Sequence, residues 1–254
     1  MFVLLRKRRL IPAAFFCGFL LLPLLLWAGL SIYPVQTFGV ENGEARVVII
    51  DPGHGGEDGG AVADDGTEES GINLAVSLRL EGIFRFLGVP TEMTRREDVM
   101  VCDSGLATLR QRKVSDIHNR AALVNQTPGA VLLSIHQNSL PSSPVTHGAQ
   151  VFWNRQEGAE ALAGQMQELL NEKINTHRPK EAKRISDGIY LMNHVNVPAV
   201  LVECGFLSNG EEAVNLLRED YRSFRLTRML DLLREDYQTM LAALIAAGYM
   251  RWDG

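Results

Sequence analysis

Three apolar, strand-like runs of this sequence each end in a side chain that can bind a metal ion or transfer a proton. The runs are VVIIDPGH, AVLLSIH and AVLVE, and they end at His54, His136 and Glu203. A fourth candidate, Glu69, opens the helix expected after the first run. Strands of an open α/β sheet lie side by side, and ligands usually bind at their carboxyl ends. We therefore expect these four side chains to share one site.

The types of these side chains indicate catalytic zinc. Two imidazoles and one carboxylate give zinc three protein bonds and leave a fourth position for water. The remaining Glu could then act as a general base. Gly53, Gly55 and Gly56 predict a sharp turn that lets His54 point into a cleft. Such a turn could instead bind phosphate, but neither G-x-x-x-x-G-K-S/T nor G-x-G-x-x-G is present, which makes phosphate a minor alternative.

Taken singly, the four candidate residues differ in how strongly each indicates a functional site. Glu69 would stabilise the dipole of its helix in any case, and a lone His136 at a strand end is more often structural. Glu203 is more informative, because a carboxylate within PAVLVECGF is costly to bury without a partner. A nearby metal ion or reacting group supplies such a partner.

The elements that must position these residues alternate between strand and helix. This alternation predicts a three-layer α/β domain with a central, mostly parallel sheet flanked by helices. We expect strands at residues 46–51, 89–94, 130–134, 148–153, 190–192 and 199–206 and helices at 69–87, 116–125 and 157–174. We also expect a charged surface loop at 176–187 and helix after residue 206.

The first forty residues differ in kind from the rest. Four basic residues, 6–9, precede an apolar run at 10–33 that is long enough to cross about 30 Å of hydrocarbon. We expect an uncleaved membrane-anchor helix whose basic flank stays in the cytoplasm; a cleaved signal with a secreted product, or a buried core helix, are the alternatives. The predicted domains are the anchor with its linker at 1–40 and an extracytoplasmic catalytic domain at 41–254.

Charge and cysteine content exclude several classes of protein. Without the four basic residues, 21 Lys and Arg stand against 30 Asp and Glu, a formal charge of −9 that argues against a nucleic-acid partner. The three cysteines show no C-x-x-C spacing, so neither a structural zinc site nor a disulfide framework is indicated. Cys204 could be a thiol nucleophile, but strand neighbours alternate, so we expect it to face away from Glu203 as a small core residue.

One duplication stands near the C-terminal end of the sequence. LREDY occurs at residues 217–221 and again at 233–237. Two copies sixteen residues apart are too few and too close for a solenoid. We interpret them as an extension of the terminal helical region with a solvated face, and partner binding is the alternative.

At these residues the chain resembles the zinc-dependent N-acetylmuramoyl-L-alanine amidases of the amidase 3 type. The matching stretches are VVIIDPGHGGEDGGAV, the ESGINL segment that starts at Glu69, SIHQNS, HGAQVFW and VPAVLVECGFLSN. Position by position, the resemblance places the zinc ligands on His54, Glu69 and His136 and the catalytic glutamate on Glu203. It implies hydrolysis of the amide bond between N-acetylmuramic acid and L-alanine in peptidoglycan.

The plan of an anchor followed by a lean catalytic domain looks most like the spore-cortex subgroup of these amidases. That subgroup implies peptidoglycan glycan strands with stem peptides as substrate, the membrane as a partner through the anchor, and an activating lipoprotein as a candidate partner. Two other classes stay open from the residues alone: a zinc carboxypeptidase or deacetylase acting on the same polymer, and a metal-free wall-binding module.

Three further side chains are weaker candidates for the site. Asn138 could contact substrate or form a turn. Arg120 could bind a peptide carboxylate, although a surface ion pair is the more common role for such a residue. His147 could support the site from behind or be merely exposed.

Overall fold

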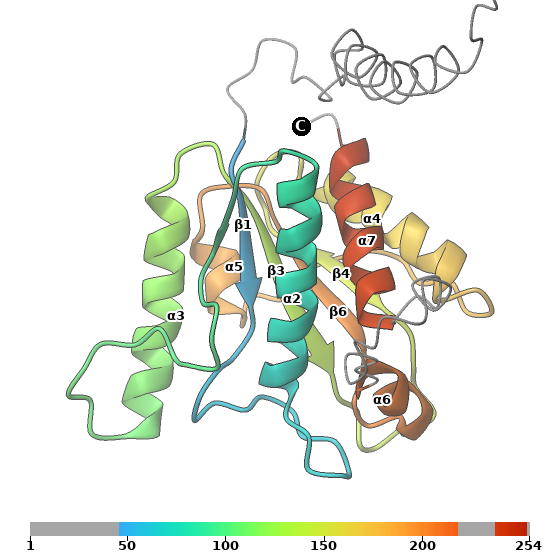
Figure 1. The fold of residues 1–254 in the computed structure, drawn as a ribbon, viewed down its shortest axis with the longest axis horizontal. Coiled ribbons are helices and arrows are strands. Elements are labelled where there is room, and N and C mark those ends of the chain that lie inside the picture. The colour runs from blue at the N-terminus through green and yellow to red at the C-terminus, as the bar shows by residue number, and fades with distance from the viewer. Residues whose placement is uncertain (1–45, 218–236, 253–254) are drawn as a thin grey trace, which may run out of the picture. The chain divides into compact units, whose positions relative to one another are not determined.

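The β-branched apolar runs of the sequence form a mixed six-stranded sheet (Figure 1). The computed structural model describes residues 46–217 and 237–252. In the sheet order β2-β1-β3-β6-β4-β5, neighbours are parallel except β4 and β6, which are antiparallel. The strands are β1 (Val48–Pro52), β2 (Thr91–Met93), β3 (Val131–Asn138), β4 (Gln150–Trp153), β5 (Lys183–Arg184) and β6 (Ala199–Phe206).

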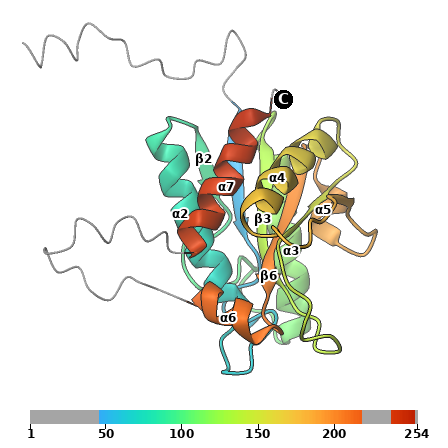
Figure 2. The same cartoon turned by 90° about the vertical axis from the view of Figure 1, so that its right-hand side faces the viewer.

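Helices cover both faces of this sheet, as the three-layer prediction requires (Figure 2). Along β1, Val48 and Ile50 face one apolar core and Ile49 faces the other, which is the alternation expected of a strand. The first core is closed by α2 (Glu69–Phe86), α4 (Ala159–Lys173) and α7 (Tyr237–Arg251), and the second by α3 (Leu109–Asn125) and α5 (Tyr190–His194); α6 (Gly210–Leu217) follows β6.

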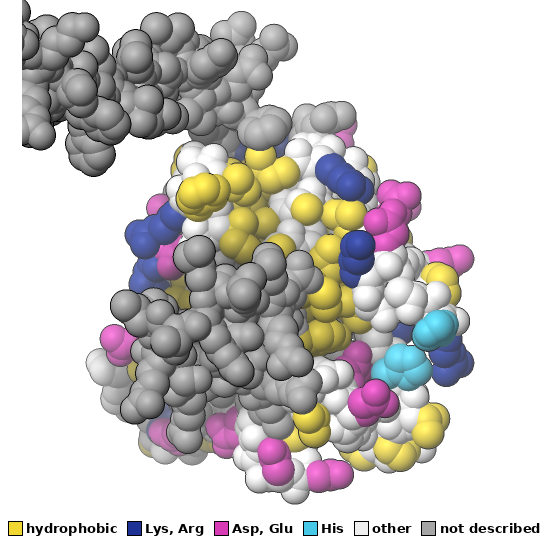
Figure 3. Space-filling model, turned by 45° about the vertical axis from the view of Figure 1, so that its right-hand side comes forward, with side chains coloured by type: hydrophobic (Ala, Val, Ile, Leu, Met, Phe, Trp, Pro, Cys, Tyr) yellow, Lys and Arg dark blue, Asp and Glu magenta, His cyan; other side chains and the backbone are white. Residues whose placement is uncertain are grey.

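Helix α7 packs closely between its two neighbours. The rings of Phe84 on α2 and Tyr249 on α7 meet edge to face with centroids 5.3 Å apart. On the other side, a Cβ at Gly248 would lie 2.4 Å from Met166 Cγ of α4, so only glycine permits this approach. The helix has no charged residue before Arg251, and Figure 3 shows hydrophobic side chains gathered over this side of the molecule. These contacts secure the layer from which Glu69 projects.

Three of the expected elements differ from the structure in type, length or content. Residues 190–192 form the start of α5 rather than a strand, and the helix stacks the rings of Tyr190 and His194 at 3.8 Å, one turn apart. Helix α3 begins at Leu109 instead of residue 116, because Thr108 and Gln111 form a reciprocal capping box. The surface loop expected at 176–187 contains the two-residue strand β5.

Two of the sequence predictions lie wholly or mostly outside the described residues. They are the membrane anchor at 10–33 and the LREDY duplication, of which only Leu217 and Tyr237 are described. Within the described part of the chain, no helix combines the length and the apolar character needed to cross a membrane.

A buried ionic network joins β1 to α3 directly beneath the loop that carries His54. The guanidinium of Arg120 is 2% exposed and lies 2.7 Å from Asp51 Oδ1 and 2.6 Å from Asp116 Oδ2. Thr94 and Ser134 also donate hydrogen bonds to Asp51. Burial alone would raise the pKa of Asp51, but the charge of Arg120 and these hydrogen bonds outweigh burial and lower it. Asp51 therefore stays ionised as the buried partner of Arg120.

We expect Arg120→Met to lower the free energy of unfolding by about 3–5 kcal/mol, because it leaves two carboxylates without their buried cation. Urea denaturation would measure this change. The control is Arg155→Met, which removes an exposed ion pair with Asp187 and should cost less than about 1 kcal/mol. Equal losses in the two variants would contradict a structural role for the buried network.

Candidate metal and catalytic site

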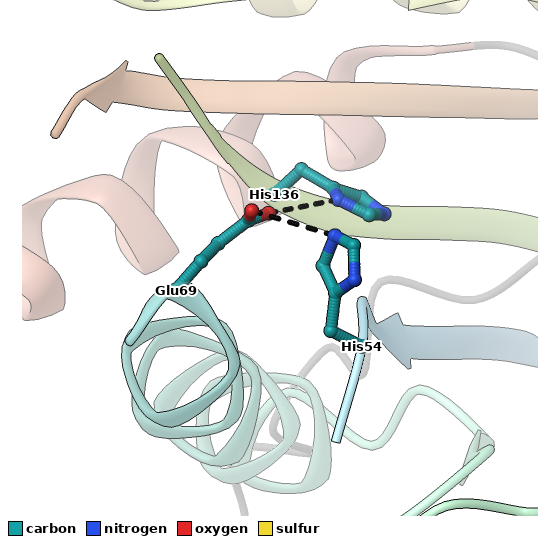
Figure 4. Close-up of side chains that lie close together, drawn as sticks. All are labelled: His54, Glu69 and His136. Atoms are coloured by element: carbon teal, nitrogen blue, oxygen red, sulfur yellow. Dashed lines mark hydrogen bonds and ion pairs between the residues drawn. The ribbon is translucent and has the colours of Figure 1, made fainter. Parts of the chain in front are cut away.

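Three of the four predicted residues converge at the carboxyl ends of β1 and β3 (Figure 4). His54 follows β1, Glu69 is the first residue of α2, and His136 lies on β3. His136 Nδ1 is 3.0 Å from Glu69 Oε1, and His54 Nε2 is 3.4 Å from Glu69 Oε2. Each residue offers one ligand atom, and these atoms lie within 4.8 Å of one another. A single metal ion can therefore reach all three.

The loop after β1 turns sharply, as the glycines predicted. His54 has a φ of 60°, and Gly55 and Gly56 also have positive φ. Gly53 serves another purpose, because a Cβ there would lie 2.2 Å from Cε1 of His136. At Gly60 a Cβ would lie 2.5 Å from Glu69 Oε2. Glycine at 53 and 60 is thus required for the close approach of loop and side chains.

Glu69 is held by donors on every side. Its Oε1 accepts hydrogen bonds from the backbone N–H of Gln137 and from Asn73 Nδ2, and its Oε2 accepts one from the N–H of Ala61. Burial opposes ionisation, but the hydrogen bond with His136 and the nearby imidazoles lower the pKa of Glu69 to about 2. The side chain is a fixed carboxylate, which is what a metal ligand requires.

Asn73 is a site residue to which the sequence analysis gave no role. It is fully buried one helical turn after Glu69, and its amide donates both to Glu69 Oε1 and to the carbonyl of Gly53. It therefore joins the helix ligand to the β1 loop. The signal available in the sequence was the four-residue spacing between Glu69 and Asn73, which puts both on one face of a helix.

Glu203 lies beside this group on β6, where it pairs in register with His136 of β3. Residues paired in this way project from the same face of the sheet. Glu203 Oε2 is buried and has no hydrogen-bond partner among the residues that the structure describes. Burial raises the pKa of Glu203 to about 7. Its environment is the opposite of that of Glu69, with a carboxyl group poised to exchange a proton near neutral pH.

A pocket of about 350 Å³ brings all four residues to one surface. Apolar side chains, among them Ile117, Leu191 and Met192, line its other wall. Cys204 does not take part: it lies in the core behind the sheet, and burial raises the pKa of its thiol above the usual range. The prediction that Cys204 faces away from Glu203 is confirmed.

The weaker candidates have other roles. The interpretation of Arg120 as a surface ion pair was wrong, since its side chain is buried; it donates to the carbonyls of Pro52 and His54 from the interior. Asn138 accepts a hydrogen bond from the next N–H in the chain, as a turn residue does. The exposed His147 contacts the carbonyl of Val145.

Several known proteins that are similar to this chain are described as amidases. Residues 48–231 match the family described as N-acetylmuramoyl-L-alanine amidase. The germination-specific N-acetylmuramoyl-L-alanine amidase of Bacillus subtilis is 35% identical over 178 residues, which cover 70% of this chain and 73% of that protein. The amidase AmiA of Escherichia coli is 27% identical over 61% of this chain and 47% of its own length.

A solved structure gives the same result for the fold. The CwlD amidase from Clostridioides difficile, determined in complex with the GerS lipoprotein, superimposes with a TM-score of 0.72 at 30% sequence identity. The superposition covers 82% of this chain and 98% of that one. The family resemblance noted in the sequence is thereby confirmed: the chain belongs to the N-acetylmuramoyl-L-alanine amidase family and is an enzyme of that class.

Proposed function

We propose that this amidase is zinc-dependent, with His54, Glu69 and His136 as the metal ligands and Glu203 as the catalytic acid and base. The observation that carries the proposal is a preassembled His–Glu–His group beside the carboxyl group of Glu203, whose buried Oε2 has no hydrogen-bond partner in the described part of the chain. Two imidazoles and one carboxylate are a known ligand set of catalytic zinc that leaves a position open. The residues present therefore fit zinc.

Zinc bound there supplies Lewis acidity, which lowers the pKa of water from about 15.7 toward about 7 and stabilises negative charge on a carbonyl oxygen. The protein's own part is proton transfer. Glu203 accepts a proton from the attacking water while the oxygen of that water bonds to the lactyl carbonyl carbon. The same carboxyl group then donates that proton to the departing nitrogen of L-alanine, and the amide bond breaks without a covalent enzyme intermediate.

The setting of the reaction is also part of the proposal. The similarity to a germination-specific amidase and to CwlD supports a role in the spore cortex. We place the catalytic domain outside the cytoplasm, held to the membrane by residues 10–33, whose apolar character is the support for an anchor. Because CwlD was determined with the GerS lipoprotein, we include a lipoprotein among the partners to be tested.

The reaction can be tested with the whole chain in detergent and purified peptidoglycan. We expect mass spectrometry to find free stem peptides that begin with L-alanine, formed with zinc and lost with a chelator. A carboxypeptidase would instead release a terminal amino acid, and a deacetylase would release acetate. Turnover that is unchanged after all metal has been removed would contradict zinc dependence.

The role of Glu203 predicts a separation of zinc binding from turnover. Glu203→Gln should retain zinc and lose about 10²–10⁴-fold in rate, because the amide cannot exchange the proton. His54→Ala should lose both zinc and activity. Zinc content by elemental analysis and product formation by mass spectrometry measure the two effects, with His147→Ala as the control that keeps both. A near-normal rate for Glu203→Gln would remove Glu203 from this role.

The close approach at Gly53 predicts that one methyl group will disturb the metal site. Gly53→Ala puts a Cβ against the ring of His136, so we expect weaker zinc binding, measured by competition with a chelator. The matched control is Gly82→Ala on α2, where a Cβ meets nothing within 4 Å. That variant should keep its zinc affinity and become slightly more stable, by up to about 1 kcal/mol. Equal zinc affinity in both variants would refute the packing argument.

A further inference from the structure

The imidazole of His54 meets a different carboxylate with each of its nitrogens. Nε2 faces Glu69 Oε2, whereas Nδ1 lies 3.0 Å from Asp58 Oδ2. A neutral imidazole has only one N–H, and the hydrogen bond made by one nitrogen fixes which of them carries the proton. The contact with Asp58 therefore bears directly on whether Nε2 has a free lone pair for a metal ion.

We propose that Asp58 is a positioning residue that accepts the Nδ1–H of His54 and so keeps the Nε2 lone pair directed toward Glu69. The inference rests on the proposed function, in which His54 is a metal ligand. Metal-binding histidines commonly donate their second N–H to a carboxylate, which fixes the tautomer and the orientation of the ring.

Asp58 is itself firmly held, which a positioning residue must be. Lys113 of α3 places its Nζ 2.7 Å from Asp58 Oδ1, the oxygen that His54 does not use. The backbone closes the loop from the other side, because the N–H of Gly55 donates to the carbonyl of Asp58 and the N–H of Asp58 donates back to Gly55. The carboxylate of Asp58 is sheltered, with 17% of the side chain exposed, whereas Lys113 reaches it from a side chain that is 48% exposed.

His54 needs such support more than His136 does. His136 lies on the central strand β3, and its ring packs against Gly53 so closely that no Cβ would fit between them. His54 instead lies in a loop with left-handed backbone, although the exposed fractions of the two side chains are similar, 27% for His54 and 20% for His136. The strand backbone and the packing against Gly53 hold the imidazole of His136, whereas the loop residue His54 has its contact with Asp58 in addition to its packing against Gly60.

The zinc affinity of the whole chain, measured by competition with a chelator, tests this role. We expect Asp58→Ala to weaken binding about 10–100-fold, and Asp58→Asn, which keeps an acceptor oxygen, to recover part of the loss. The matched control is Glu57→Ala: Glu57 is the adjacent acid, pairs with Arg112 of the same helix and is 64% exposed. It should bind zinc as the wild type does.

The tautomer of His54 gives a readout that does not need the metal. At about pH 8.5, where imidazole is ordinarily neutral, nitrogen NMR of the metal-free protein should show the proton of His54 on Nδ1 in the wild type. In Asp58→Ala we expect it to shift toward Nε2, which faces the remaining carboxylate of Glu69. An unchanged tautomer in Asp58→Ala, or an equal loss of zinc affinity in Glu57→Ala, would overturn the proposal. Zinc binding by His54→Ala at wild-type strength would instead refute the metal site, while the tautomer still decides the role of Asp58.

Discussion

The path of the backbone after β1 depends on two buried arginines. Arg95 donates to the carbonyls of Pro52 and Gly53, and Arg120 donates to those of Pro52 and His54. Three consecutive carbonyls thus accept hydrogen bonds from guanidinium groups. In this backbone path His54 has a φ of 60°. A left-handed residue other than glycine is strained by roughly 1–3 kcal/mol and persists only where its surroundings determine it. These hydrogen bonds supply that determination, and they aim His54 at Glu69.

The two arginines place two positive charges close together beneath the site. Burial and the charge of Arg120 lower the pKa of Arg95 to about 10, while Asp51, Asp98 and Asp116 work against that shift. Both arginines stay charged at neutral pH because acids surround them. Replacing a whole network of this kind by apolar groups is often neutral, whereas removing one partner is costly because the other charges stay buried. Here the two arginines also hold the carbonyls of residues 52–54 in one geometry.

The two glutamates of the site, Glu69 and Glu203, have the same side chain but opposite environments. Glu69 receives hydrogen bonds from α2, from β3 and from the loop, and it stays ionised. Glu203 lies beside it with one buried oxygen that has no hydrogen-bond partner among the described residues, and burial raises its pKa to about 7. Pairs of titratable groups driven apart in this way are typical of sites that need one permanent charge and one proton carrier. The division of roles therefore follows from the surroundings and not from the residue type.

The sequence by itself determined the layered fold, the strand that precedes His54, the strands that carry His136 and Glu203, and the residue types that meet at their ends, because apolar periodicity and residue type are local properties of the chain. It misjudged residues 190–192, where a short apolar run fits a strand or a helix equally well and only the packing against the sheet decides. Contacts between distant segments were decided by the tertiary structure alone. A sequence cannot show that Arg120 is interior, that Asn73 joins Glu69 of α2 to the loop after β1, or that Gly53 makes room for His136, since each of these depends on which surfaces the folded sheet brings together.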